Sequence, residues 1–401
     1  MNIIFFDDQK TKTQLLPFSF LRPVAEIRTG ILKISEKWQN YTGGSISFLT
    51  ENYLSGKYPA NFTSKNIYIN GCVCPSPELV KHVKSLGNNE VVFTDETLFA
   101  IKSDANFSCF EELQLFAKTS CKHISISSEN LTLIDKPWKI FLSNKDQIKN
   151  DFELITKGRK SQPITDKHSI VYGEDQIFLE EGAQVQAAIL NAQDGPIYIG
   201  KNAKIQEGAI VKGSFALCEG AQVNIGAKIR GDNTFGPYAK VGGEVTNSVI
   251  FGYSNKGHDG YLGNSVIGEW CNLGADTNNS NLKNNYSEVK VWNYLEEKLT
   301  GSGQQFCGLM MGDHSKCGIN TMFNTGTVIG IGAIIFGGGF PNKFIPSFTW
   351  GGVNSFDTYQ LPKMLELATH VMERKGIKCT DQDKEILENI FETTAKFRSQ
   401  F

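Results

Sequence analysis

The most regular feature of the chain is a six-residue repeat that begins after about residue 165. An aliphatic or aromatic residue returns at every sixth position along Ile205, Val211, Leu217, Val223, Ile229, Phe235 and Val241. Small residues lie four positions after such residues, at Ala203, Ala209, Ala221, Ala227 and Ala239. A short fixed period is typical of a solenoid, and a period of six predicts a parallel β-helix in which each hexad forms one face of a triangular coil. The aliphatic residues are then expected to point inward, with the small residues near the corners.

The repeat is interrupted in two places, and both interruptions mark candidate functional segments. The step from Leu262 to Ile267 is five residues instead of six. Between about residues 276 and 305 the hexads stop, and the asparagine-rich residues 277–285 are expected to leave the coil as a loop. Loops that leave a solenoid often carry function. The phase then returns at Met311, Cys317, Phe323, Ile329 and Ile335.

The chain on either side of the repeat shows other periodicities. Apolar runs at 3–6, 66–71 and 90–93, with a helical pattern over 77–86, predict an α/β domain. After residue 355 an apolar stripe predicts a helix that ends at Gly376, and Thr380 is expected to cap a second helix. We expect this tail to pack on the coil or on a neighbouring subunit. The predicted domains are an α/β domain over 1–165, a β-helix over 166–345 and a helical tail over 346–401.

Glycine usage follows the same division of the chain. Residues 1–160 contain 7 of the 39 glycines, residues 161–355 contain 31, and the remainder contains one. Glycine permits tight corners, so this excess agrees with a coil. The formal charge of −2 argues against nucleic acid or an anionic membrane surface as a partner. The start of the chain is unlike a signal peptide, no apolar run reaches the roughly 18 residues of a membrane span, and the nine cysteines are scattered, which together predict a cytoplasmic protein with reduced thiols.

One of the six histidines differs from the others in its context. His258 lies in the glycine-flanked segment 255–264, directly before the five-residue step. An imidazole titrates near neutral pH, so on such a kinked segment it is a candidate general base, although a lone histidine is also often structural. For a metal site the chain offers only one close cysteine pair, Cys72 and Cys74, and we therefore predict none.

Three motifs around His258 carry a resemblance to a known family. They are Gly-His-Asp-Gly-Tyr-Leu-Gly at 257–263, Ile-Gly-Glu-Trp-Cys-Asn-Leu-Gly-Ala at 267–275 and Asn-Leu at 281–282. In this order and spacing they resemble the acetyltransferase half of bifunctional sugar-1-phosphate nucleotidyltransferase/acetyltransferases, and the last motif with residues 287–291 is more similar to the archaeal branch. The resemblance covers about residues 165–340. It implies a left-handed parallel β-helix that forms a homotrimer and binds acetyl-CoA between subunits.

The same resemblance implies roles for individual residues. His258 is implied to be the general base for the amino group of a sugar, while backbone N–H groups of the coil hold the developing oxyanion. The implied sugar-phosphate contacts are Arg230, Tyr261 and Asn272, and the implied cofactor contacts are Asn281, Gly274 and Ala275. Thr246 stands where the family has a phosphate-binding lysine, so the identity of the sugar stays open.

The N-terminal domain resembles the nucleotidyltransferase half of the family less completely. Residues 17–23 are similar to its P-x-x-x-x-R-P stretch, and residues 69–72 are similar to its L-N-G-D motif. The phosphate loop after Phe6 contains no glycine, and Cys72 replaces the aspartate that would bind Mg²⁺, for which a thiol is a poor ligand. We therefore expect nucleotidyl transfer to be lost or redirected, with Mg²⁺ required only if the domain is active. Arg22 and Arg28 are its candidate anion contacts.

The leading hypothesis is an acetyl-CoA-dependent N-acetyltransferase that acts on an amino-sugar 1-phosphate in sugar-nucleotide or cell-envelope biosynthesis. Three alternatives stay open. The first is sugar-1-phosphate nucleotidyl transfer by the N-terminal domain, and the second is a non-catalytic homologue that binds sugar nucleotides. The third is a metal hydrolyase similar to γ-type carbonic anhydrases, which needs three converging histidines where the hexad repeat offers His258 and His314.

Overall fold

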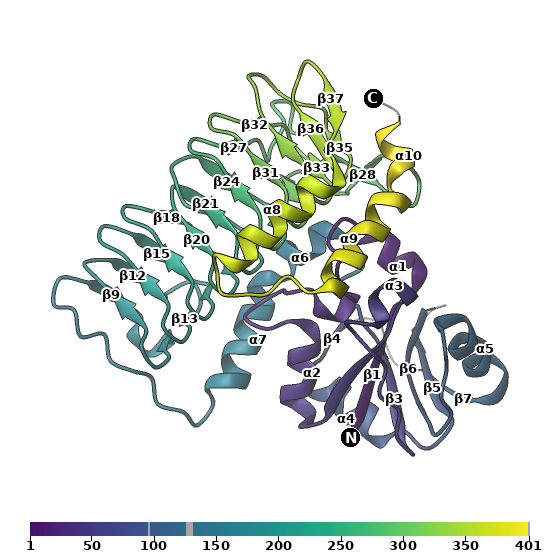
Figure 1. Ribbon diagram of the computed structural model, residues 1–401. Helices are drawn as coiled ribbons and strands as arrows, with labels where there is room; N and C mark the ends of the chain where they lie inside the picture. Colours follow the sequence, from purple (N-terminus) through teal and green to yellow (C-terminus); the bar gives the residue numbers. More distant parts are fainter. Residues whose placement is uncertain (95–96, 126–130, 400–401) are drawn as a thin grey trace. The chain divides into compact units, whose positions relative to one another are not determined.

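The computed structural model describes residues 1–94, 97–125 and 131–399, and the chain divides into two compact units (Figure 1). The first unit comprises Met1–Leu15, Ser19–Ile27 and Leu32–Lys139. The second comprises Leu16–Phe18, Arg28–Ile31 and the chain from Ile140 onward.

This division differs from the three predicted domains, because the helix before the coil and the helical tail both belong to the second unit. The amide of Asn144, in helix α7 (Asn144–Thr156), donates to the carbonyl oxygen of Asp232 at 3.0 Å and accepts from the hydroxyl of Thr234 at 3.0 Å. Both partners lie on the coil. A helix that packs on a coil leaves no trace in the six-residue period, so the hexads by themselves do not assign this helix to the coil.

The first unit is an α/β fold around a mixed six-stranded sheet, as predicted. Its strand order is β2 (Ser45–Leu49), β1 (Asn2–Phe6), β3 (Asn66–Asn70), β6 (Thr97–Ser103), β5 (Glu90–Thr94) and β7 (Lys122–Ser125). A separate pair consists of β4 (Val73–Cys74) and β8 (Thr132–Leu133). The helices are α1 (Gln9–Gln14), the 3₁₀ turn η1 (Val24–Glu26), α2 (Ile34–Thr42), α3 (Asn52–Ser55), α4 (Pro77–Ser85) and α5 (Phe110–Ser120), with α6 (Pro137–Leu142) at the junction between the units.

The second unit is a parallel β-helix with three faces, which confirms the fold predicted from the hexads. The first face contains β10 (Ile177–Leu179), β13 (Ile197–Ile199), β16 (Phe215–Leu217), β19 (Asn233–Phe235), β22 (Val249–Ile250), β25 (Val266–Ile267), β30 (Met310–Met311), β33 (Val328–Ile329) and β35 (Phe344–Ile345). The second contains β11 (Gln184–Val185), β14 (Lys204–Ile205), β17 (Gln222–Val223), β20 (Lys240–Val241), β23 (Asn255–Lys256), β26 (Asn272–Leu273), β31 (Lys316–Cys317), β34 (Ile334–Ile335), β36 (Thr349–Gly351) and the antiparallel β37 (Phe356–Thr358).

The third face starts at the beginning of the coil, and the 3₁₀ turn η2 (Glu174–Gln176) follows its first strand. It contains β9 (Ile170–Tyr172), β12 (Ile189–Asn191), β15 (Ile210–Lys212), β18 (Lys228–Ile229), β21 (Glu244–Thr246) and β24 (Tyr261–Gly263), followed by the pair β27 (Asn278–Asn279) and β32 (Met322–Phe323). The hexad residues lie in one continuous buried core inside the three faces, with Ile205, Val223 and Phe235 fully buried. Apolar burial on this scale is the main favourable term for folding a coil of short strands.

The expected loop is shorter than predicted. Asn278 and Asn279 form strand β27 of the coil instead of leaving it, and Asn279 is buried. The chain leaves the coil only after these residues and forms an antiparallel hairpin of β28 (Lys290–Asn293) and β29 (Lys298–Gly301). Asparagine runs usually favour turns. In β27 the asparagine side chains instead accept hydrogen bonds from backbone N–H groups of the preceding turn of the coil.

The tail packs on the coil of its own chain. It consists of α8 (Leu361–Glu373), α9 (Asp381–Thr393) and α10 (Ala395–Arg398), and Gly376 follows α8 with a φ of 73°. Thr380 caps α9 in a capping box with Asp383, as the sequence predicted. Met372 and Cys379 at the end of α8 and beyond it are buried against Trp270 of the coil. Among the described residues, no helix is both long and apolar enough to cross a membrane.

Candidate functional site

The His258 corner, residues 257–260, turns the chain from the second face of the coil to the third. Gly260 has a φ of 121°, and a Cβ added there would lie 2.2 Å from the carbonyl oxygen of Thr277. Only glycine fits both the backbone conformation and this approach of the next turn. The corner leaves His258 exposed, and its imidazole forms no hydrogen bond within the described part of the chain.

A buried lysine supports this corner from inside the coil, and sequence reasoning missed it. Lys256 is 2% exposed and pairs with Val241 in the inward register of the second face. Its ammonium donates to the carbonyl oxygen of His258 at 2.6 Å. Burial lowers the pKa of Lys256 to about 8, although the charges of Asp259 and Asp276 oppose this change. A signal existed in the sequence, because Lys256 occupies an inward position that is apolar in the neighbouring turns.

The predicted sugar contacts Arg230 and Tyr261 lie together on the third face. Glu244 of β21 is the register partner of Tyr261 in β24, and its carboxylate binds the guanidinium of Arg230 at 3.1 Å. The hydroxyl of Tyr261 accepts from the amide of Asn281 at 3.0 Å, and this amide also donates to Asn264 at 2.7 Å. Burial raises the pKa of Tyr261, so the phenol stays neutral and is a hydrogen-bonding group.

The asparagines of β27 build this part of the third face. The side chain of Asn278 accepts from the N–H of Tyr261 at 2.8 Å, and that of Asn279 accepts from the N–H of Gly263 at 2.9 Å. These amide side chains replace the backbone carbonyl groups that neighbouring turns use. The replacement satisfies the buried donors of β24 and holds Tyr261 in position.

Asn272 lies on the second face, on the other side of the His258 corner. It is exposed and pairs in register with Asn255 and Lys316. A cavity of about 720 Å³ opens on this face, and His258 and Asn272 both line it. His258 also lines a second cavity of about 370 Å³. The structure therefore brings Arg230, Tyr261 and Asn281 together on one side of His258 and places Asn272 on the other.

The predicted cofactor residues Gly274 and Ala275 form the next corner of the coil. The N–H of Gly274 donates to the carbonyl oxygen of Cys317 at 3.1 Å, and a Cβ added there would lie 2.4 Å from the backbone of Gly318. The carbonyl oxygen of Ala275 accepts from the N–H of Asn320 at 2.8 Å. Close packing between turns accounts for a glycine at position 274.

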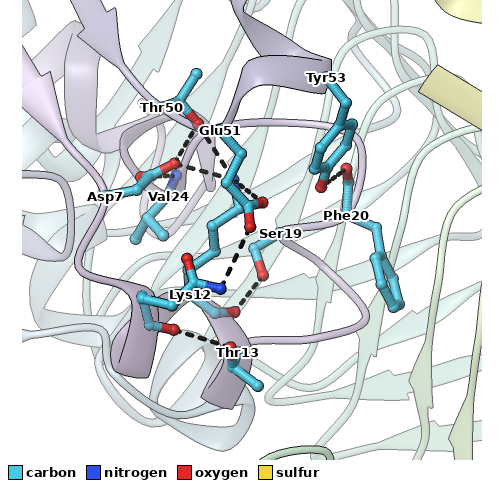
Figure 2. A network of polar contacts seen from close by, with 10 residues as sticks. Asp7, Lys12, Thr13, Ser19, Phe20, Val24, Thr50, Glu51 and Tyr53 are labelled. Atoms are coloured by element: carbon cyan, nitrogen blue, oxygen red, sulfur yellow. Dashed lines mark hydrogen bonds and ion pairs between the residues drawn. The ribbon is translucent and has the colours of Figure 1, made fainter. Parts of the chain in front are cut away.

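In the first unit, an internal ion pair lies where the resemblance implies a phosphate loop (Figure 2). The Asp7 carboxylate accepts from the N–H of Val24 at 2.9 Å, from the ammonium of Lys12 at 3.0 Å and from the hydroxyl of Thr50 at 2.6 Å. Lys12 is 2% exposed and also lies 3.4 Å from the carboxylate of Glu51. The backbone after Asp8, which would surround a phosphate in a phosphate loop, instead forms helix α1.

The other predicted residues of the nucleotidyltransferase half are buried. Arg22 is 5% exposed and belongs to the first unit. Arg28 belongs to the second unit, where its guanidinium donates to the carbonyl oxygen of Ile31. Burial raises the pKa of the Cys72 thiol, which therefore stays neutral. Within residues 1–94, 97–125 and 131–399, no group of three or more His, Cys, Asp or Glu side chains is placed to hold a metal ion.

These features define the class of the molecule, which combines an α/β nucleotidyltransferase-like unit with a parallel β-helix and a short helical tail. Residues 3–160 match the model of the sugar nucleotidyl transferase family. The bifunctional sugar-1-phosphate nucleotidylyltransferase/acetyltransferase of Sulfurisphaera tokodaii is 31% identical over 172 residues, which cover 38% of this chain and 42% of the relative. The resemblance to this bifunctional family that the motifs indicate is confirmed.

One further curated relative and one solved structure are also similar to parts of this chain. The bifunctional protein GlmU of Methanococcus aeolicus is 39% identical over 87 residues, which cover 22% of this chain and 20% of the relative. The solved structure of the polySia-specific acetyltransferase NeuO aligns with 49% of this chain and 84% of its own at 14% identity, with a TM-score of 0.27. The matched segments span less than half the length of these two curated relatives.

Proposed function

We propose that the chain is an acetyl-CoA-dependent N-acetyltransferase that acts on an amino-sugar 1-phosphate in sugar-nucleotide biosynthesis, with His258 as its general base. The observation that carries this proposal is the placement of one exposed imidazole on a rigid corner between two groups of polar side chains. Arg230, Tyr261 and Asn281 lie on one side, and the cavity with Asn272 lies on the other. Relatives named as sugar-1-phosphate nucleotidylyltransferase/acetyltransferases support the substrate class.

In the proposed reaction the sugar amine attacks the acetyl carbon of a thioester. A carbon–nitrogen bond forms, the carbon–sulfur bond breaks, His258 accepts the proton lost by nitrogen, and the departing sulfur takes up a proton. The thioester supplies the activated acetyl group. Arg230 binds the sugar phosphate once its bond to Glu244 opens, Tyr261 and Asn272 orient the sugar, and Asn281 with the backbone of Gly274 and Ala275 faces the cofactor. The cavity suits a phosphate-bearing cofactor, because basic side chains and no carboxylate are among its lining residues.

A family resemblance also implies a homotrimer with the cofactor between subunits, and we propose this assembly for the full chain. Sedimentation equilibrium gives the mass of the particle directly. A monomer at micromolar concentration contradicts the proposed assembly, and the site then lies within one chain.

Thiol release from acetyl-CoA, measured against a panel of amino-sugar 1-phosphates, tests the activity. His258→Ala is expected to lower kcat by about 10²–10⁴-fold, since this is the usual contribution of a general base. His168→Ala is the matched control, because His168 is also exposed at the start of the coil. Turnover that is unchanged in His258→Ala would show that the base lies elsewhere.

A second candidate function is sugar-1-phosphate nucleotidyl transfer by the first unit, which the family match over residues 3–160 favours. The saturated Asp7 carboxylate and the neutral Cys72 thiol argue against it. A pyrophosphate-release assay with nucleoside triphosphates, Mg²⁺ and sugar 1-phosphates tests whether the first unit catalyses nucleotidyl transfer. Turnover that survives His258→Ala would assign nucleotidyl transfer to the first unit.

A further inference from the structure

The last turn of the coil presents a tryptophan on its outer surface. Trp350 of β36 is 44% exposed, whereas its neighbours Thr349 and Gly351 are buried. Its register partner in β37 is Asp357, so the two side chains lie next to each other on the same side of the strand pair. A single exposed apolar side chain needs no explanation by itself. The surroundings of this one make it a candidate binding residue.

A cavity of about 290 Å³ opens beside the tryptophan, and we call it the Trp350 pocket. It is formed within the second unit by the end of the coil and the start of α8, and its lining residues are Trp350, Asp357, Thr358, Tyr359, Gln360 and Lys363. The cavity beside His258 instead reaches the far end of α8, which spans 13 residues or about 20 Å (Figure 1). The Trp350 pocket is therefore separate from the site proposed for acetyl transfer.

The aromatic wall of the pocket is held in place by the coil. Phe336 of the preceding turn packs edge-to-face against Trp350, with the ring centroids 4.6 Å apart and an interplanar angle of 65°. The N–H of Tyr359 donates to the carbonyl oxygen of Phe348 at 2.7 Å, which ties the segment after β37 to the coil. A pocket that is already formed requires little ordering when a ligand binds.

The polar side chains of the pocket are not used by the fold. Asp357, Gln360 and Lys363 form no side-chain hydrogen bond or ion pair with any described residue. Gln360 is the N-cap residue of α8, but its side chain does not cap the helix. A carboxylate, an amide and an ammonium group are therefore available to a ligand beside the exposed indole ring.

These groups together favour a neutral ligand that is rich in hydroxyl groups. The charges of Asp357 and Lys363 cancel, so the pocket lacks the positive field that attracts phosphate groups. A sugar hydroxyl donates and accepts hydrogen bonds, and it can therefore pair with a carboxylate, an amide or an ammonium group. The C–H groups on one side of a pyranose ring carry a small positive charge, which suits the negative face of an indole.

We infer that the Trp350 pocket binds one pyranose ring of a neutral saccharide. The sugar ring stacks on Trp350, and its hydroxyl groups bind Asp357, Gln360 and Lys363. The inference stands on this pocket and does not depend on the proposed acetyl transfer. A volume of about 290 Å³ lies at the lower end of the range for small-molecule pockets, which suits a single ring. A free monosaccharide and the end of an oligosaccharide share this chemistry, and the experiment separates the two sources.

The test measures saccharide binding to the full chain and to Trp350→Ala by isothermal titration calorimetry. The probes are glucose and N-acetylglucosamine as single sugars, with maltotriose and tri-N-acetylchitotriose as their oligomers. Phe340→Ala is the matched control, because Phe340 is 52% exposed and does not line the pocket. We expect the wild type to bind at least one probe with a millimolar dissociation constant. Trp350→Ala should weaken that binding at least about 10-fold, and the control should change it less than about twofold.

Two conservative variants show whether a loss of affinity comes from the binding groups or from a misfolded turn. Trp350→Phe keeps an aromatic face and is expected to bind within about threefold of the wild type. Asp357→Asn keeps the shape of the side chain but removes its charge, and we expect it to weaken binding about 3–10-fold. A thermal melt followed by circular dichroism compares the folding of each variant with that of the wild type.

The outcomes decide both the site and the source of the sugar. Tighter binding of an oligomer than of its single sugar, lost in Trp350→Ala, confirms the pocket and identifies the end of an oligosaccharide as its ligand. Equal affinities, again lost in Trp350→Ala, confirm the pocket for a single sugar. Wild-type protein that binds no probe at tens of millimolar overturns the inference, and so does binding that is unchanged in Trp350→Ala. An oligomer that dissociates in Trp350→Ala, with no saccharide bound by the wild type, would assign the ring to an interface between copies of this chain.

Discussion

Replacing Lys256 with methionine tests whether the coil sacrifices stability to support the His258 corner. Methionine keeps the length and apolar stem of the side chain but removes the ammonium. The inward positions around Lys256 are otherwise apolar, as at Val241, Leu262 and Leu273. The variant therefore continues the core through this turn, while the carbonyl oxygen of His258 loses its donor at 2.6 Å.

The size of the effect follows from the pKa of the lysine. Burial lowers this pKa from the ordinary 10.5 to about 8, and each pKa unit corresponds to about 1.4 kcal/mol. The ammonium therefore destabilises the folded state by roughly 3 kcal/mol relative to the neutral amine at pH 7. Loss of the hydrogen bond to the His258 carbonyl costs about 1–2 kcal/mol. We expect Lys256→Met to raise the free energy of unfolding by about 1–2 kcal/mol at pH 7 and to lower kcat.

The pH dependence separates this account from simple core filling. Because the folded-state pKa lies below the unfolded-state value, the unfolded chain binds more protons between pH 8 and 10.5. The wild type should therefore gain stability relative to the variant as pH rises through this window, and the difference should be constant below it. Urea unfolding followed by circular dichroism at pH 7, 8, 9 and 10 measures the difference, with Lys228→Met, on the exposed surface of the coil, as the control.

Two results would refute the reasoning. A variant that is less stable than the wild type at pH 7 would show that the ammonium contributes net stability. A difference in stability that does not change between pH 7 and 10 would show that the pKa of Lys256 is not lowered by its burial.

Three other substitutions test separate parts of the structure. Tyr261→Phe removes a hydroxyl that accepts an amide N–H at 3.0 Å, and we expect the KM for the amino sugar to rise about 10-fold in steady-state assays. Gly260→Ala is expected to lower the free energy of unfolding by more than about 2 kcal/mol. The control Gly226→Ala, whose added Cβ would meet nothing within 4 Å, is expected to lower it by about 1 kcal/mol. Thermal melts of the two variants measure the difference. Asp7→Asn leaves the buried ammonium of Lys12 without its nearest carboxylate and should destabilise the first unit by about 3–5 kcal/mol in urea; an effect below 1 kcal/mol contradicts the importance of this pair.

The sequence predicts the coil well because the six-residue period directly marks which side chains are buried. Every hexad residue named from Ile205 to Val241 lies in the continuous core, and each predicted apolar run of the first unit is a strand. The sequence predicts secondary structure poorly where side-chain oxygens replace backbone carbonyl groups as hydrogen-bond acceptors. Asn278 and Asn279 read as loop residues, yet they form β27 because their side-chain oxygens accept the N–H groups of the preceding turn.

The candidate site is only partly visible in the sequence, because some of its parts are brought together by packing. The motif at 257–263 locates His258 and Tyr261 within a single turn. The cavity of about 720 Å³ beside His258 instead joins Lys240, Lys316 and Arg374, which are separated by 76 and 58 positions along the chain. A lysine on an exposed strand position looks like any solvated side chain until the helix that completes the cavity is in place.

The interior of the coil also indicates where function is concentrated. The hexad position of the repeat is apolar through most turns, and Lys256 and Asn279 occupy it on either side of the five-residue step. Each of these side chains contacts backbone that positions a candidate residue, at the His258 carbonyl and at Gly263 beside Tyr261. A core that only had to fold would place aliphatic residues at both positions, since buried polar groups weaken a core unless they are fully paired. The departures from the period therefore agree with selection for the geometry of the His258 corner over stability.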